Sequence, residues 1–451
     1  MIQEDILQSK DFLDLDSSKA GIGAYELAKI LFPINRSITG DGVRETLKII
    51  SQTLPSLVQY EVPTGTHCFD WEVPKEWNIK NAYLLDPNGK RILDFKNHNL
   101  HVVGYSVPID KEITLDDLQP HLHSIPEQPS AIPYVTSYYK EQWGFCLEHR
   151  QREGLKDGSY RAVIDSSLKQ GHMTYGELIL PGESKDEILL STYICHPSMA
   201  NNELSGPTVT TMLAKWLISQ PTLRYTYRIV FIPETIGSIA YLSMNYSEMK
   251  RNIVAGFNIT CVGDSRSYSY IPTISGDTLS DNALKHTLKH NVDNYITYSY
   301  MDRGSDERQY NSPGIDIPVA CFCRSKYGEY PEYHTSLDNL SLLSPDSLYE
   351  SYILLKKTIL CIEDDIVLKS LILCEPNLGK RGLYSNISQV NSRRPISKNI
   401  LDIISYCNGD RTLLEVANII DISMSEIKKI ATIMISNKLV EVCNNNVNDL
   451  Y

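Results

Sequence analysis

The sequence predicts an α/β protein with a β-rich inserted domain and a small C-terminal winged-helix domain. After residue 172, short apolar runs alternate with amphipathic helical spacing, which is typical of a sheet covered by helices on both faces. Between about residues 61 and 171 the pattern changes to β-type runs broken by turn signals. Residues 400–442 show the spacing of three short helices, as in a winged-helix unit.

These patterns give the expected domain boundaries. We expect an α/β domain formed by residues 1–60 and 172–370, the insert at 61–171, a linker at 371–395 and the winged-helix domain at 396–451. In the α/β domain, strands are expected at 187–194, 227–232, 253–262 and 317–323, and helices at 23–32, 43–51, 206–219, 236–249, 278–290 and 345–366. In the insert, Pro87-Asn88-Gly89 predicts a hairpin turn.

Composition excludes several classes of function. Of 451 residues, 43 are Lys or Arg and 55 are Asp or Glu, which gives a net charge of −12. So acidic a chain disfavours non-specific binding of nucleic acid or anionic lipid. No apolar run approaches the roughly 20 residues of a membrane helix, no signal peptide is visible, and the ten Cys form no CxxC pair. We therefore expect a cytoplasmic protein with reduced thiols.

The C-terminal unit has the shape of a DNA-binding domain but not the charge of one. Residues 385–451 contain seven basic and seven acidic side chains, whereas DNA-reading domains normally carry a basic face. We expect no nucleic-acid partner for this unit. A protein-contact role is expected instead, in a homo-oligomer or in docking.

Side chains suited to catalysis follow the predicted strands, where the carboxyl ends of parallel strands meet at one edge of a sheet. His196, Glu234, Asp264 and His334 each follow a strand or lie in the loop after one. Imidazole and carboxylate bind Zn²⁺, and a nearby unligated carboxylate can take a proton from metal-bound water. Each residue alone has a structural explanation, but together they favour a metal site. Arg36, in the loop at 35–42, either binds a substrate carboxylate or caps a helix.

Six segments carry a resemblance to a known family: NRSITGDGVRETL, VPKEWNI, YVTSYYKEQWGFC, STYICHPSMANNELSGP, PETIGSIAYLS and RGSDERQY…YGEYPEYHTSLDNL. The chain resembles bacterial aminopeptidase-like proteins with a β-rich insert and a C-terminal winged helix. These belong to the superfamily of zinc aminopeptidases, glutamate carboxypeptidase and glutaminyl cyclase. The resemblance implies a zinc-aminopeptidase-like mixed sheet flanked by helices, hydrolysis of an amide bond and a link to surface-polysaccharide biosynthesis.

Some of the superfamily's metal-site residues have the same residue type at the matching position of this sequence, and others do not. Its first and last His ligands match His196 and His334, and its general-base glutamate matches Glu234. Its bridging aspartate falls on Asn202, and its adjacent metal-binding glutamate falls on Thr235. A neutral amide cannot offset the repulsion between two dications, so the resemblance implies at most one zinc ion.

Two further motif positions complete the expected site. The aspartate after the third strand aligns with Thr260, with Asp264 as its substitute. The predicted zinc ligands are therefore His196, His334 and Asp264, with Glu203 as a less favoured donor. The Ser-Asp-His motif appears as Ser305-Asp306-Glu307, so Asp306 and Glu307 are expected to bind substrate together with Arg36.

The leading prediction is an aminopeptidase-like metallohydrolase that cleaves an amide bond of a small, peptide-like or chain-end substrate, with Glu234 as the proton acceptor. Two alternatives remain open. One is a metal-poor enzyme for amide or acyl transfer on an amino-sugar precursor, and the other is a non-catalytic binding protein. The insert is expected either to roof the cleft or to mediate oligomerisation.

Overall fold

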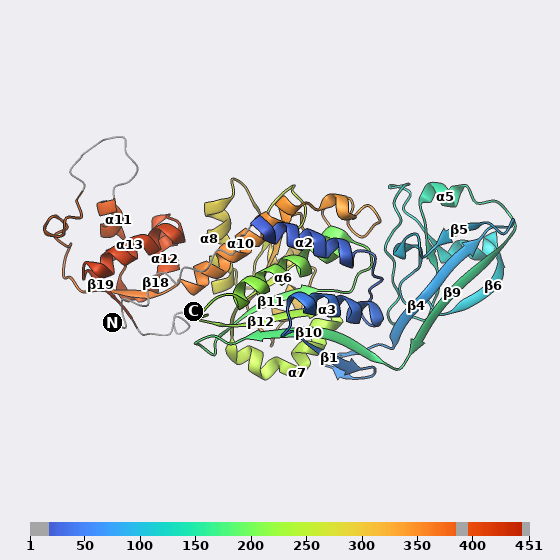
Figure 1. The fold of residues 1–451 in the computed structure, drawn as a ribbon, viewed down its shortest axis with the longest axis horizontal. Coiled ribbons are helices and arrows are strands. Elements are labelled where there is room, and N and C mark those ends of the chain that lie inside the picture. The colour runs from blue at the N-terminus through green and yellow to red at the C-terminus, as the bar shows by residue number, and fades with distance from the viewer. Residues whose placement is uncertain (1–17, 385–395, 444–451) are drawn as a thin grey trace.

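The computed structural model describes residues 18–384 and 396–443. The insert lies at one end of the molecule, the α/β domain in the middle and the winged unit at the other end (Figure 1). Residues 385–395 of the predicted linker and 444–451 of the predicted winged domain lie outside the described residues. No helix of the described part is long and apolar enough to cross a membrane.

An eight-stranded mixed sheet organises the α/β domain, in the order β1-β10-β12-β11-β13-β16-β14-β15. The four central strands β12, β11, β13 and β16 run parallel, whereas β10 and β14 pair with them antiparallel. The strand bounds are β1 Val58–Pro63, β10 His172–Leu180, β11 Glu187–Tyr193, β12 Thr226–Ile232, β13 Ile253–Ile259, β14 Ser269–Ile271, β15 Ile296–Thr297 and β16 Val319–Cys323. The parallel centre places four carboxyl ends at one edge.

Helices cover both faces of this sheet (Figure 1). Along β11, Ile188 and Leu190 join the core cluster beneath α2, α6 and α10, while Leu189 joins the cluster on the α7 side. This alternation is expected of a buried strand. The helix bounds are α2 Ser18–Leu31, α3 Asp41–Thr53, α6 Ser205–Ile218, α7 Ile236–Asn252, α8 Leu279–Asn291, α9 Glu307–Tyr310 and α10 Pro345–Glu363.

Sequence signals account for the ends of several elements. Helix α10 begins with Pro345 at its first position, after Ser344, whose side chain accepts the N–H of Ser347. Helix α8 begins with a capping box between Thr278 and Asp281. The strands and helices predicted for the α/β domain are all present, and most of their ends lie within three residues of the expected ones.

The insert is built on a four-stranded antiparallel sheet in the order β5-β4-β9-β6. Gly89, with a φ of 76°, lies in the turn between β4 and β5, so the predicted hairpin is confirmed. The bounds are β2 His67–Cys68, β3 Trp71–Glu72, β4 Glu76–Leu85, β5 Arg91–Asp94, β6 Ile109–Thr114, α4 Leu115–Leu118, β7 Leu122–His123, β8 Phe145–Cys146, α5 His149–Glu153 and β9 Ser159–Lys169.

The C-terminal unit combines three helices with a three-stranded sheet in the order β18-β17-β19. Strand β17 pairs with both other strands, so the unit begins near residue 367, inside the range predicted for the α/β domain. The short segment VLKS after α10 does not itself show which sheet it joins. The bounds are β17 Val367–Ser370, α11 Ile396–Ile404, β18 Asn408–Thr412, α12 Leu413–Ile420, α13 Met424–Ser436 and β19 Val440–Val442.

Helix α13, the second helix of the helix-turn-helix, lies against the α/β domain. The backbone N–H of Met424 donates to His286 Nε2 on α8 at 2.9 Å. Lys428 Nζ donates to Asp364 Oδ1, just after α10, at 2.6 Å. In a helix-turn-helix protein this helix normally enters the major groove of DNA. Here part of its polar surface is already used within the chain.

We therefore expect the full-length protein to show no specific DNA affinity at physiological salt. The charge of the unit is balanced, and Lys428, one of its two adjacent lysines, is paired with Asp364. Fluorescence anisotropy against a library of double-stranded DNA would measure this, with a basic winged-helix protein as the positive control. Sequence-specific binding tighter than about 10⁻⁸ M, the usual specific range, would contradict the prediction.

Candidate functional site

Four segments bring polar side chains to one edge of the central sheet. Cys195 and His196 follow β11, Glu234 follows β12, Thr260 follows β13, and the loop after β16 carries His334. The register of β11 against β12 and β13 is parallel throughout. The structure thus brings His196, Glu234 and His334 together, as the sequence predicts.

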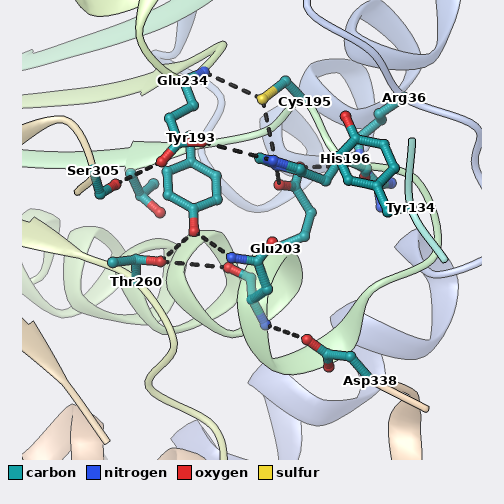
Figure 2. Close-up of polar contacts among 12 residues, drawn as sticks. Arg36, Tyr134, Tyr193, Cys195, His196, Glu203, Glu234, Thr260, Ser305 and Asp338 are labelled. Atoms are coloured by element: carbon teal, nitrogen blue, oxygen red, sulfur yellow. Dashed lines mark hydrogen bonds and ion pairs between the residues drawn. The ribbon is translucent and has the colours of Figure 1, made fainter. Parts of the chain in front are cut away.

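The two histidines form the centre of the site. The ring centroids of His196 and His334 lie 5.3 Å apart, and the ring of Tyr134, from the insert, packs against both at 5.3 and 5.2 Å. Nε2 of His196 lies 3.6 Å from Oε2 of Glu234, and Nε2 of His334 is buried without a hydrogen-bond partner. Figure 2 shows His196 between Tyr134 and the Glu234 carboxylate.

Glu203 and Arg36 fix the orientation of His196. Glu203 lies in a π-helical turn, η3 Ala200–Leu204, that leads into α6. Its Oε2 lies 2.8 Å from Nδ1 of His196, and its Oε1 lies 3.3 Å from Nε of Arg36. In the tautomer with its proton on Nδ1, His196 donates to the carboxylate, and the lone pair of Nε2 faces Glu234. This is the carboxylate–histidine pairing that commonly orients a metal ligand.

Both imidazoles are held in the neutral form that binds metals. Burial, and then the Arg36 guanidinium, lower the pKa of His196 to about 3. Burial, and then His196, lower the pKa of His334 to about 3. Two unprotonated ring nitrogens are therefore available near neutral pH.

The surroundings of Glu234 suit a proton acceptor. Ser305 Oγ donates to its Oε1 at 2.8 Å. Burial, and then the nearby Asp306 carboxylate, raise the pKa of Glu234 to about 8, so this carboxylate is unusually basic and is mostly ionised only above that pH. The next residue, Thr235, has a φ of 66°, a rare conformation for a β-branched residue that often marks a functional site.

The positions that would complete a two-metal centre are neutral here. Asn202 Nδ2 donates to the hydroxyl of Tyr193 at 2.7 Å, and that hydroxyl lies 2.5 Å from Thr260 Oγ1. Thr235 Oγ1 accepts from Arg308 Nη2 at 3.0 Å. His196 and His334 therefore remain as candidate ligands for one metal ion, and the neutral side chains at positions 202 and 235 do not fit a second.

The expected third ligand, Asp264, does not face the histidine pair. Its two oxygens accept hydrogen bonds from Asn201 Nδ2, from the N–H and hydroxyl of Ser325, and from the N–H of Arg266. Four donors satisfy the carboxylate, so it holds loops together instead of binding metal.

One group of potential metal ligands does converge within the described part of the chain: Cys195, His196 and Glu203. Glu203 is already shared between His196 and Arg36, and burial raises the pKa of the Cys195 thiol well above its usual value. Cys195 Sγ accepts the N–H of Glu234 at 3.2 Å. This group therefore supports the site from behind His196.

The three predicted substrate-binding residues are all buried. Nη1 of Arg36 donates to the carbonyl of Leu31, the last residue of α2, at 2.7 Å, which matches the helix-capping alternative. Glu307 Oε1 accepts from two backbone N–H groups and from Tyr327. Asp306 Oδ1 accepts from the N–H of Thr235 and from Ser238 Oγ near the start of α7. These contacts give the three side chains supporting roles in the fold.

Sequence reasoning missed several contributors to the site. Tyr134 comes from the insert and is the first residue of the motif YVTSYYKEQWGFC, but nothing in that motif marks it as a neighbour of the two histidines. Asp338 lies in the quoted motif YHTSLDNL, and its carboxylate accepts the N–H groups of three successive residues in η3, which include Asn201 and Asn202. Two motifs that are far apart in the sequence therefore position each other.

Replacing Arg36 with methionine should strongly destabilise the protein. The change leaves the buried Glu203 carboxylate without its partner, which typically costs about 3–5 kcal/mol. Chemical denaturation measures the loss, and the double variant Arg36→Met with Glu203→Gln should recover part of it. Arg161→Met is the matched control, because its ion pair with Asp110 is exposed and such pairs contribute at most about 1 kcal/mol. Equal losses in the two single variants would refute the buried-pair argument.

Solved structures share this architecture. A crystal structure of a "putative peptidase" from Clostridium acetobutylicum is 43% identical, has a TM-score of 0.89, and covers 95% of this chain and 98% of that one. A zinc aminopeptidase from Bacillus subtilis has a TM-score of 0.54 at 14% identity, with 75% of this chain and 94% of that chain covered. At that identity the likeness shows a common fold. The zinc-aminopeptidase-like fold expected from the sequence is thus confirmed.

Sequence comparisons identify the family. A curated relative from Clostridium acetobutylicum, named "Putative polysaccharide biosynthesis protein with aminopeptidase-like domain", is 46% identical over 404 residues, or 89% of this chain and 92% of the relative. Residues 366–442 match the model of a winged helix-turn-helix, and residues 25–365 match that of a domain of unknown function, DUF4910. The chain therefore belongs to the DUF4910 family, with an aminopeptidase-like domain followed by a winged helix-turn-helix.

Proposed function

We propose that this protein is a hydrolase that cleaves an amide bond with the help of one zinc ion. A single observation carries the proposal. Nε2 of His196 lies 3.6 Å from the Glu234 carboxylate, and the ring of His334 packs beside that of His196 with its own Nε2 buried and without a partner. Imidazole nitrogens are common ligands of catalytic zinc, and a nearby unligated carboxylate can take a proton from the attacking water. His196 and His334 would hold the ion, beside Glu234.

The remaining chemistry belongs to residues of this chain. When bound, zinc supplies Lewis-acid polarisation of the amide carbonyl. Glu234, held by Ser305, accepts a proton from the attacking water and returns it to the leaving amine. Glu203 keeps the proton of His196 on Nδ1. Tyr134 covers both imidazoles and limits the access of bulk water.

The insert would restrict the site to small or chain-end substrates. Its segment 132–134 pairs with the loop that carries His334: the N–H of Tyr134 donates to the carbonyl of His334 at 2.8 Å, and Ile132 and Ser336 exchange two hydrogen bonds. The insert thus lies directly over the histidine pair. The name of the curated relative supports a role in polysaccharide biosynthesis, and an amide of a sugar precursor is a substrate of suitable size.

Elemental analysis of protein purified without added metal would test the proposal. We expect about one equivalent of zinc per chain, and loss of most of it in His196→Ala and His334→Ala, because each variant removes one of two imidazole ligands. His172→Ala is the control, since this histidine is half-buried and lies on β10, outside the candidate site. A wild-type protein without zinc, whose turnover is insensitive to chelators, would contradict the proposal and favour amide or acyl transfer without metal.

A further inference from the structure

Arg308 is a partly buried cation beside the candidate site that lacks a carboxylate partner. Its Nη2 donates to Thr235 Oγ1 at 3.0 Å, and its Nε is buried without an acceptor. No carboxylate of the described residues lies within ion-pair distance of it. A guanidinium has five N–H donors, and the hydrogen bond to Thr235 uses one of them.

Other buried guanidinium groups in the α/β domain behave differently. Arg36 pairs with Glu203, Arg228 pairs with Glu187, and Arg324 pairs with Glu350. Buried charges are normally paired because removing them from water is costly. Arg308 is partly buried and its charge lowers the pKa of both Glu234 and Asp306 against the larger effect of burial, but it forms no ion pair of this kind, and that difference needs a physical reason.

The residues around Arg308 give a reason why it has no ion-pair partner. Thr235, to which it donates, directly follows Glu234, and Arg308 follows Ser305 by three residues and Asp306 by two. Glu234, Asp306 and Glu203 all lie in or behind the site, and such a cluster of carboxylates repels an anion. Arg36, the other cation near the site, is fully buried and already forms an ion pair with Glu203. An anionic substrate would need a cation beside the site that is not already paired with a carboxylate.

We propose that Arg308 anchors an anionic group, a carboxylate or a phosphate, that the substrate carries next to the amide to be cleaved. The planar fork of a guanidinium matches both groups with two parallel hydrogen bonds. That the anionic group lies next to an amide rests on the proposed amide hydrolysis. Binding of an anion by Arg308 does not depend on turnover. Arg308 is a specificity residue in this role.

Calorimetric titration of the full-length protein with two probes tests the anchor. N-acetylglycine and N-acetylglycinamide both contain an amide and differ in the carboxylate alone. We expect the carboxylate probe to bind at least about tenfold more tightly, because hydrogen bonds to charged groups are the stronger ones. Arg308→Gln should abolish this preference, and Arg308→Lys should keep part of it, because the charge remains but the fork is lost.

Arg303→Gln is the matched control. This arginine lies five residues before Arg308, but its guanidinium stacks on Tyr300 and donates to the carbonyl of that residue, so the preference should persist. Inorganic phosphate, titrated in parallel, distinguishes the two anions: tighter binding of phosphate assigns a phosphate substrate, and weaker binding assigns a carboxylate. Equal binding of the two amide probes to the wild type, or a preference that survives in folded Arg308→Gln, would overturn the anchor.

These outcomes separate the anchor from the proposed function. Anion binding that depends on Arg308, in a protein without zinc or turnover, would refute the hydrolase and leave the anchor standing. Zinc-dependent turnover of neutral amides, with no preference for the carboxylate probe, would support the hydrolase and refute the anchor.

Discussion

Glu234→Gln should lower amide turnover by a factor on the order of 10²–10⁴ while the fold and the zinc content stay unchanged. The glutamine amide has almost the same shape as the carboxylate, and its carbonyl can still accept the hydrogen bond from Ser305. It cannot take a proton from water. Steady-state turnover on the amide that wild type cleaves fastest, with elemental analysis of the same preparation, measures both parts of the expectation.

The control for this variant is Glu153→Gln, a carboxylate on the insert that is mostly exposed. It should leave turnover unchanged. If Glu234→Gln retained near-normal activity in a preparation free of wild-type enzyme, Glu234 would be removed from the mechanism. A loss of activity that coincided with a loss of zinc would instead make Glu234 a ligand, because its Oε2 already faces Nε2 of His196.

The positions of the site residues along the chain could be predicted because they depend on one rule. In a sheet with parallel central strands, residues that follow those strands meet at one edge, and His196 and Glu234 lie within three residues of the ends of β11 and β12. Local periodicity gave the strands themselves. The rule gives proximity, but it does not say which atoms face each other.

Because the rule does not give the orientation of side chains, it could not show that Asp264, the predicted third ligand, turns away from the histidines. Its place after β13 suited a ligand, yet its carboxylate turns to Asn201 and Ser325. The sequence also could not show that Tyr134 packs on both histidines, because the contact joins the insert to loops 60 and 200 residues away. Such contacts depend on how the insert packs on the α/β domain.

Asn202→Asp combined with Thr235→Glu should raise the zinc content from about one ion per chain towards two. The first change places a carboxylate where the neutral amide now lies, and a carboxylate can offset the charge of two dications. The hydroxyl of Tyr193 tolerates it, because a hydroxyl both donates and accepts: it can donate to the new aspartate and accept from Thr260. The second change adds a further ligand at a position where the backbone already has a positive φ.

The matched control is Asn202→Asp with Thr235→Gln, which has the same size without the second carboxylate and should stay nearer to one ion. Zinc content after dialysis against a weak chelator would distinguish the two variants. Glu at position 235 would lie next to Arg308, so the pairing of these two charges competes with metal binding, and Arg308→Gln in the same background should increase occupancy further. If wild type already held two tightly bound ions, then the neutral set Asn202, Tyr193 and Thr260 would not prevent a second site, and the single-metal argument would fail.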